Sequence, residues 1–121
     1  MANVFIISGV VFAFLSIALG AFGAHALKNH LNEYSRMVYE KAILYQMFHS
    51  IGLILVALID KSYHLDLFYS GWMFIVGIML FSGSLYILAI YQIKWVGVIT
   101  PIGGIMFLIV WMLIFVKLIR L

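Results

Sequence analysis

The chain has 121 residues, of which 67% are hydrophobic and 9% are charged. Soluble domains are usually about half apolar and about a quarter charged, so this composition indicates an integral membrane protein. The formal net charge of +3 is spread thinly along the chain, which argues against a nucleic-acid partner. The absence of cysteine excludes disulfides, thiolate metal sites and iron–sulfur clusters, and we expect neither a metal nor a cofactor.

Four apolar windows are each close to the roughly 20 residues that a membrane-spanning helix needs. They lie at about residues 4–26, 42–59, 67–91 and 95–116, with the charged residues between or beyond them. Backbone groups in hydrocarbon must be hydrogen-bonded within their own segment, so each window is a predicted helix. The sequence therefore predicts one all-α domain, residues 1–121, folded as an antiparallel bundle of four transmembrane helices. Both termini then lie on one side, which we call side A; the opposite side is side B.

The first window resembles a secretory signal peptide in one respect, because Ala24-His25-Ala26 has the form of a cleavage site. No lysine or arginine precedes it, and its apolar run is longer than the apolar core of a signal peptide. We therefore expect a retained helix.

Small residues recur in the first window at spacings of 4, 3, 4 and 3, which places them on one face of a helix. They are Gly9, Ala13, Ser16, Gly20 and Gly23. The fourth window has a shorter set, Gly97, Pro101 and Gly104. Membrane helices associate closely where small residues let their backbones approach, so both sets are predicted to face neighbouring helices.

The long connection between the first two windows, residues 28–41, is amphipathic. Leu31, Tyr34 and Met37 recur at helical spacing, and Asn29 or Asn32 is placed to cap a helix. This segment either lies on the membrane at side B or extends the second helix beyond it. Its role is either that of a solvated connector or that of a lid over a site in the bilayer.

Aromatic residues flank the windows as interfacial belts do. Tyr39, Tyr45, Tyr91 and Trp95 lie toward side B, and Tyr63, Tyr69, Trp72 and Trp111 toward side A. Lysine and arginine are divided almost evenly between the two sides. The positive flank of the first helix favours side B as the cytoplasmic side, but the even division leaves the orientation open.

The unusual polar residues of all four windows share the half of the membrane nearest side B. They are His25, Gln46, His49, Ser82, Ser84, Tyr86 and Thr100. Because antiparallel helices share depth at their side-B ends, we expect these residues to surround one polar half-cavity that binds a ligand. His49, the deepest titratable group, is either a ligand-binding imidazole or a neutral ring bonded to another helix. Pro101 should remove one hydrogen bond within the fourth helix and leave room on the wall of the half-cavity opposite the first helix.

Four motifs in order carry a resemblance to a known family: GAFGAHAL at 20–27, YQMFH at 45–49, LFSGSLY at 80–86 and TPIGG at 100–104. With these motifs the chain resembles the family catalogued as domain of unknown function 423, to which transmembrane protein 256 is similar. The resemblance implies a small four-span fold in a bacterial inner membrane or a mitochondrial membrane, and it implies no assigned activity. The usage of lysine, isoleucine and tyrosine favours a bacterial inner-membrane protein.

Three functions remain open at this stage. The favoured one is a non-enzymatic protein that binds or helps move a lipid-like or hydrophobic small molecule in the side-B half-cavity, with membrane lipids as its partners. The second is an accessory or assembly subunit that docks on itself or on a larger membrane complex. The third is an intramembrane enzyme acting on a lipid or quinone with His49 as acid and base. It has the least support, because no carboxylate lies within a span and no catalytic set is recognisable by spacing.

Overall fold

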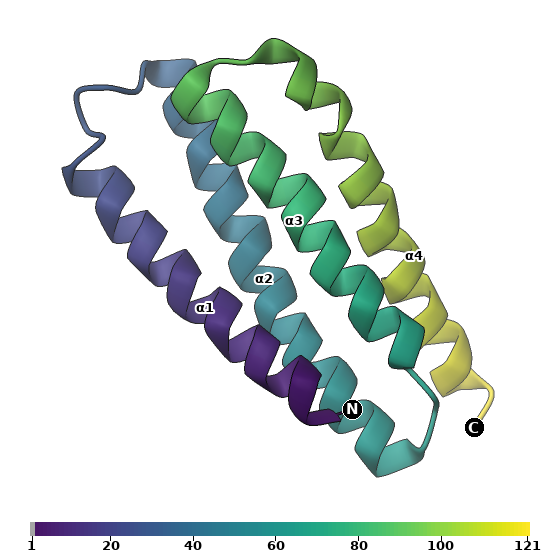
Figure 1. Cartoon of the computed structure of the whole chain (residues 1–121). Coiled ribbons are helices and arrows are strands. Elements are labelled where there is room, and N and C mark those ends of the chain that lie inside the picture. Colours follow the sequence, from purple (N-terminus) through teal and green to yellow (C-terminus); the bar gives the residue numbers. More distant parts are fainter. Residues whose placement is uncertain (1) are drawn as a thin grey trace.

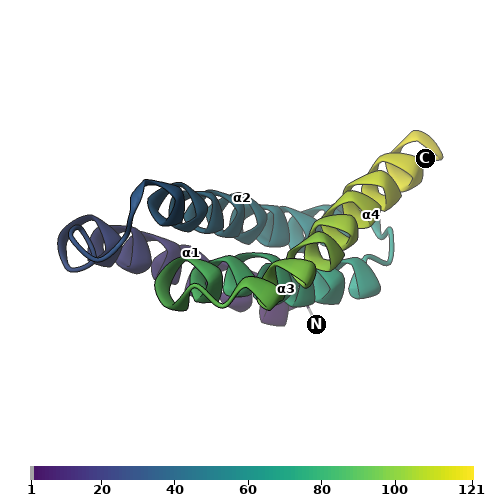
Figure 2. The ribbon, with the colours of Figure 1, turned by 90° about the horizontal axis from the view of Figure 1, so that it is seen from above.

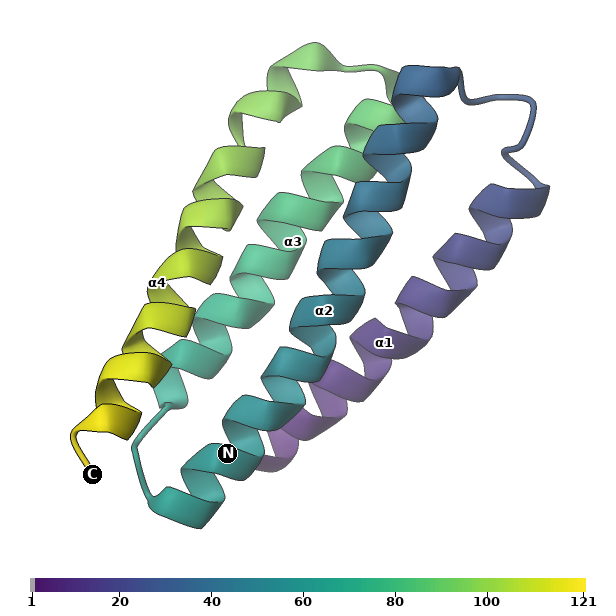
Figure 3. The same ribbon diagram turned by 180° about the vertical axis from the view of Figure 1, so that it is seen from behind.

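The computed structural model describes residues 2–121 and consists of four long helices joined by short turns (Figure 1). The helices are α1 (Ala2–His25), α2 (Glu33–Tyr63), α3 (Phe68–Tyr91) and α4 (Thr100–Ile119), with a short 3-10 helix, η1 (Lys94–Val98), before α4. Four helical segments are long and apolar enough to cross a membrane, the fourth running through η1 and α4. The all-α, antiparallel four-helix transmembrane fold is thus confirmed. Because successive helices alternate in direction, α1 begins and α4 ends at the same end of the bundle, side A (Figures 1 and 3).

Each helix packs on the next one in the chain, so the bundle is a folded row rather than a closed ring. α1 and α4 form its two edges and do not pack against each other in the described part of the chain. Seen from above, α1 and α3 lie on one side, α2 lies on the other, and α4 is inclined across α3 (Figure 2). The helices α2 and α4 therefore approach each other through side chains, while their backbones stay apart.

The boundaries of α2 decide between the two expectations for the segment 28–41. Asn32 caps the helix, because its side-chain oxygen accepts a hydrogen bond from the backbone N–H of Ser35 at 2.7 Å. From Glu33 onward the chain is one continuous helix of 31 residues, about 46 Å long at 1.5 Å per residue. The hydrocarbon core is about 30 Å thick, so the amphipathic segment is mainly an extension of the second helix.

The start of α4 corrects the prediction for Pro101. The sequence predicts one helix from residue 95, with Pro101 breaking a hydrogen bond in its interior. The structure has η1 first and begins α4 at Thr100, so Pro101 lies in the first turn. The first N–H groups of a helix have no intrahelical partner, so proline costs little there.

Glycine allows close approach at two helix pairs. A Cβ on Gly9 would lie 2.7 Å from the Ser50 carbonyl oxygen, and one on Gly23 would collide with the ring of Tyr39. Between α3 and α4 the same holds at Gly103, whose added Cβ would lie 2.6 Å from the backbone nitrogen of Phe81. These pairs pack backbone against backbone, as small residues permit in a membrane.

The two small-residue sets differ in where the structure places them. In α1, Ser16 is fully buried, and Ala13 and Gly20 are half-buried. In the fourth segment, a Cβ on Gly97 would meet open space and Pro101 is exposed. Gly104 lies near the ring of Phe81, with an added Cβ at 3.5 Å. The glycine that brings α4 onto α3 is thus Gly103, one residue away from the predicted set and therefore on a different face of the helix.

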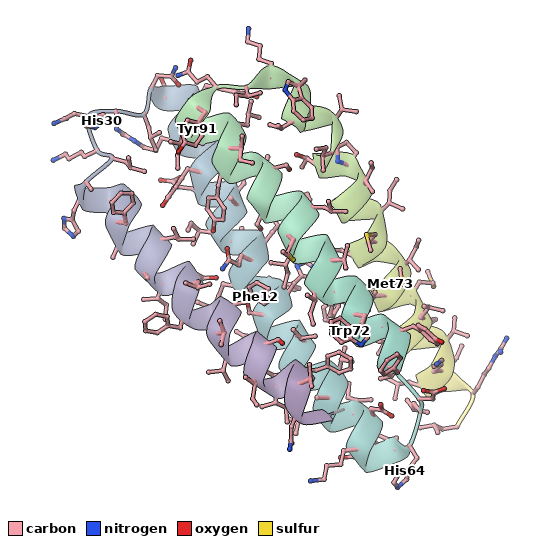
Figure 4. All side chains as sticks on the ribbon, viewed as in Figure 1. Phe12, His30, His64, Trp72, Met73 and Tyr91 are labelled. Carbon is pink, nitrogen blue, oxygen red and sulfur yellow. The ribbon has the colours of Figure 1, made fainter. Side chains whose placement is uncertain are left out.

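The polar ends of the molecule are visible in the side-chain view (Figure 4). His30 lies at side B and His64 at side A, while Phe12, Trp72 and Met73 lie between the two ends. The largest core cluster is apolar, with Leu53 of α2 and Val110 of α4 fully buried in it. This division of polar ends and apolar flanks is what a bilayer requires of a spanning bundle.

Candidate functional site in the groove between α2 and α4

His49 lies at the meeting point of α2, α3 and α4 with only 4% of its surface exposed. Its ring is parallel to that of Phe107, with centroids 3.5 Å apart. The Trp111 indole Nε1–H donates to His49 Nε2 at 3.1 Å. Indole is a donor only, so Nε2 must be the unprotonated nitrogen and the neutral ring carries its proton on Nδ1. That Nδ1 is 2.9 Å from the carbonyl oxygen of Tyr45, to which it donates.

Next to this pair is a groove of about 790 Å³ between α2 and α4. Its lining comes from three helices: Leu44, Tyr45, Phe48 and His49 of α2, Phe81 of α3, and Pro101, Gly104, Ile105, Phe107, Leu108 and Trp111 of α4. The lining is almost entirely apolar. Leu44, Phe48, Ile105 and Leu108 are largely exposed at its rim, so the groove opens sideways along the flank of the bundle.

Gln46 connects α1, α2 and α3. Its side-chain Nε2 donates to the carbonyl oxygen of Phe12 at 2.9 Å, and its Oε1 accepts from the Tyr86 hydroxyl at 2.6 Å. Tyr39, about two helical turns nearer side B, donates its hydroxyl to the carbonyl oxygen of Leu19. In hydrocarbon such interhelical hydrogen bonds satisfy groups that would otherwise be costly. Gln46 is therefore a structural crosslink.

The serines of α3 join their neighbours in the same way. Ser82 donates to the carbonyl oxygen of Ala42 at 2.8 Å, which ties α3 to α2. Ser84 shares a hydrogen bond with the Thr100 hydroxyl, which ties α3 to the start of α4. In the described part of the chain, every buried side-chain nitrogen and oxygen has a partner.

The structure does not gather the seven predicted pocket residues into one half-cavity. Gln46 and Tyr86 meet among α1, α2 and α3; Ser82 lies between α3 and α2; Ser84 and Thr100 lie between α3 and α4; His49 faces α4. His25 is exposed at the end of α1 and lines a different groove. Of the seven, only His49 lines the groove between α2 and α4.

The expected lid is also displaced. Residues 28–41 contribute nothing to the lining of the α2–α4 groove. Leu31, Arg36, Tyr39 and Glu40 instead line a groove beside the end of α1. The reason is that this segment continues α2 along its own axis and does not cross the bundle.

Trp111 is the main site residue that sequence reasoning placed elsewhere. Its position in the fourth window puts it in the side-A aromatic belt, but its indole nitrogen bonds His49 inside the bundle. A usable signal exists in the spacing of Gly104, Leu108 and Trp111, which share one face of α4 at intervals of four and three. Tyr45, Phe48 and His49 likewise share one face of α2, at positions i, i+3 and i+4.

Comparison with known sequences identifies the family to which the chain belongs. The sequence profile described as "Protein of unknown function (DUF423)" matches residues 19–104, well over half of the chain. The chain belongs to the DUF423 family. The resemblance carried by the four motifs is therefore confirmed.

Full-length relatives of this DUF423 protein occur in bacteria. A UPF0382 membrane protein of Staphylococcus saprophyticus is 45% identical over 112 residues, which is 93% of either chain. The UPF0382 membrane protein YwdK of Bacillus subtilis is 44% identical over 120 residues, or 98% of either chain. No solved structure matches the chain. The protein is thus a small four-span member of an uncharacterised family of bacterial membrane proteins.

Proposed function

We propose that this DUF423 protein binds the hydrocarbon chain of a lipid-like molecule in the groove between α2 and α4, entering sideways from the bilayer. The observation that carries the proposal is the groove itself, which is apolar, is lined by three helices and opens on the flank of the bundle. Its volume of about 790 Å³ falls in the range of small-molecule sites. We further expect the protein in the cytoplasmic membrane of a bacterium, with both termini on one side.

The dimensions suit a chain rather than a compact ligand. On α4 the lining runs from Pro101 to Trp111, which corresponds to about 15 Å of helix at 1.5 Å per residue. This length is about half of the roughly 30 Å hydrocarbon core. A chain lying along the groove would therefore enter near side B and end in the middle of the bilayer beside Trp111.

Rigid aromatic side chains support a permanent groove. Phe107 stacks on His49, Phe81 contacts both Tyr45 and Phe107, and the Trp111–His49 hydrogen bond fixes the inner end. Gly104 adds no side chain on the α4 wall. A preformed groove lowers the entropic cost of binding, because few side chains must be ordered when the chain enters.

The recognition we propose depends on shape and apolar contact. Both ring nitrogens of His49 are already hydrogen-bonded, so the imidazole supports the wall and is not free to hold a ligand or to exchange a proton with a substrate. This arrangement supports a binding protein over the intramembrane enzyme.

A pair of glycine substitutions tests the proposal. Gly104→Leu puts an isobutyl group into the groove, where its Cβ has room, 3.5 Å from the Phe81 ring. Gly83→Leu is the matched control, because it is also a helical glycine and its Cβ would meet open space outside the groove. Native mass spectrometry from mild detergent should show phospholipid retained by the wild type and by G83L. We expect G104L to lose about tenfold in affinity, the factor that 1.4 kcal/mol produces.

Equal retention by G104L and G83L would overturn the proposal, because the retained lipid would then be bound elsewhere. Retention by none of the three proteins would also overturn it. The accessory-subunit hypothesis would then lead, and the same spectra would show whether a second copy or another protein remains attached.

A further inference from the structure

A second groove, of about 550 Å³, lies at side B between the end of α1 and the first turns of α2. Its rim carries His25, Lys28, Arg36 and Glu40, all of them exposed side chains. It has an excess of positive charge, with Lys28 and Arg36 against Glu40 when His25 is neutral. It shares no lining residue with the α2–α4 groove and is therefore a separate groove.

One hydrogen bond holds the guanidinium of Arg36 at the backbone of Lys28, the other basic residue of the rim. Arg36 Nη2 donates to the backbone carbonyl oxygen of Lys28 at 3.1 Å, across the turn that joins α1 to α2. The bond uses one of the five N–H donors of the guanidinium, and the fork of donors suits phosphate. The Lys28 side chain is not part of this bond, so its ammonium group is available to the same anion.

Below the rim, the groove becomes apolar. Gly20 and Gly23 of α1 face Ile43 and Tyr39 of α2 along the inner wall. Tyr39 is held there by the bond from its hydroxyl to the Leu19 carbonyl oxygen, and the lack of a side chain at Gly23 leaves room for its ring. An amphiphile bound here would have its charged group at the end of the bundle and its chain against the membrane-spanning helices.

We infer that this groove binds the phosphate of an anionic membrane lipid, with Lys28 and Arg36 as its ligands and the start of the acyl chain against Gly20 and Ile43. The inference explains the stretch Gly20–Lys28, which supplies half of the lining and which the α2–α4 groove does not use. Basic pockets between transmembrane helices are suited to phosphorylated headgroups because they pair charge at the interface with apolar walls below it.

The test is a native mass spectrometry titration of the full chain in mild detergent with phosphatidylglycerol, and in parallel with zwitterionic phosphatidylcholine. The variants Lys28→Gln and Arg36→Gln each remove one rim charge, and both side chains are exposed. Lys28→Gln also leaves the Arg36 bond intact, because that bond ends on a backbone carbonyl. Lys41→Gln and Lys94→Gln are the controls. Each removes one charge from a side chain that lies toward side B and does not line the groove. The Gly83→Leu protein, altered outside both grooves, is a further control.

We expect the wild type, K41Q, K94Q and G83L to prefer phosphatidylglycerol equally. K28Q and R36Q should each lose several-fold in affinity for it and become nearly indifferent to the headgroup. An equal loss in K28Q and K41Q would overturn the inference, because general surface charge would then explain the preference. Displacement of the lipid by millimolar inorganic phosphate would overturn the lipid headgroup as the source and identify a site for free phosphate. Chain binding in the α2–α4 groove depends on apolar contact and not on the headgroup, so phosphatidylcholine retention tests the proposed function and the preference for phosphatidylglycerol tests this inference.

Discussion

The seam between α1 and α2 and the groove between α2 and α4 are built on the same helix, yet one is closed and the other open. At the seam, Gly9 lets the α1 backbone reach the Ser50 carbonyl oxygen, and Ser16 is fully buried. At the groove, aromatic side chains such as Phe107 and Trp111 hold the partner backbone away. In a bilayer, lipid tails compete with apolar side chains on equal terms, so the closure of the α1–α2 seam depends on the small residues that let the two backbones meet.

The largest expected effect comes from a substitution that separates α1 from α2 at the closed seam. In Gly9→Leu, the new Cβ would start 2.7 Å from both the Ser50 carbonyl oxygen and Ile54 Cγ1, so α1 must shift away from α2. We expect a loss of about 3 kcal/mol in the free energy of unfolding, at the upper end of what overpacking costs. Thermal unfolding in detergent, followed by circular dichroism, measures it. Gly83→Leu, with open space at its Cβ, is the control and should stay near the wild type. Equal stability of the two variants would contradict the description of the seam.

A smaller effect concerns the polar crosslink of the closed region. Gln46→Leu leaves the Tyr86 hydroxyl without its acceptor, and we expect a loss of about 2 kcal/mol in the same unfolding assay. The double variant Gln46→Leu/Tyr86→Phe should recover part of that loss, because it removes the orphaned hydroxyl as well. If the double variant instead loses as much as Gln46→Leu and Tyr86→Phe lose together as single variants, the hydrogen bond contributes nothing to stability.

The bond at the end of the open region should be weaker still. A double-mutant cycle with His49→Phe and Trp111→Phe isolates the bond from the indole N–H to Nε2. We expect a coupling energy of about 0.6 to 1.7 kcal/mol, as for other hydrogen bonds between membrane helices. A coupling of zero would mean that Trp111 contributes packing alone.

The smallest expected effect on stability is that of a substitution at His25. His25→Ala removes an exposed side chain at the end of α1, so the free energy of unfolding should change by less than about 0.5 kcal/mol. Lipid retention in the α2–α4 groove should also be unchanged, because His25 does not line it. A large loss in either measurement would restore His25 to the site that the sequence predicts.

The sequence predicts depth in the membrane well and direction around each helix poorly. Antiparallel spans of known length fix which end of the bundle holds Gln46, Ser82 and Thr100, and composition alone yields the four spans. The order in which helices pack is a different matter. It depends on which faces fit, so residues at one depth face separate partners in the structure: Gln46 faces α1 and α3, and Thr100 faces α3.

Two single residues show the same limit. Proline destabilises the interior of a helix strongly and its first turn only slightly. The effect of Pro101 therefore depends on the residue at which η1 ends and α4 begins. The residue type and position of Trp111 are those of an interfacial belt residue, but its hydrogen-bond partner is His49, 62 positions earlier in the chain. Neither local spacing nor hydropathy carries that long-range information.

The central claim is that the α2–α4 groove holds a hydrocarbon chain in preference to the rest of the flank. The most direct measurement is photo-cross-linking of the wild type in vesicles that contain a phospholipid with a diazirine on its acyl chain, mapped by peptide mass spectrometry. Groove and flank offer residues of matched exposure: Leu108 at 70% and Phe48 at 60% in the groove, against Phe14 at 69% and Met79 at 63% outside it. We predict several-fold more adducts on Leu108 and Phe48 than on Phe14 and Met79. Adducts in simple proportion to exposure would contradict the claim, because the groove would then contact only the lipid that surrounds any membrane protein.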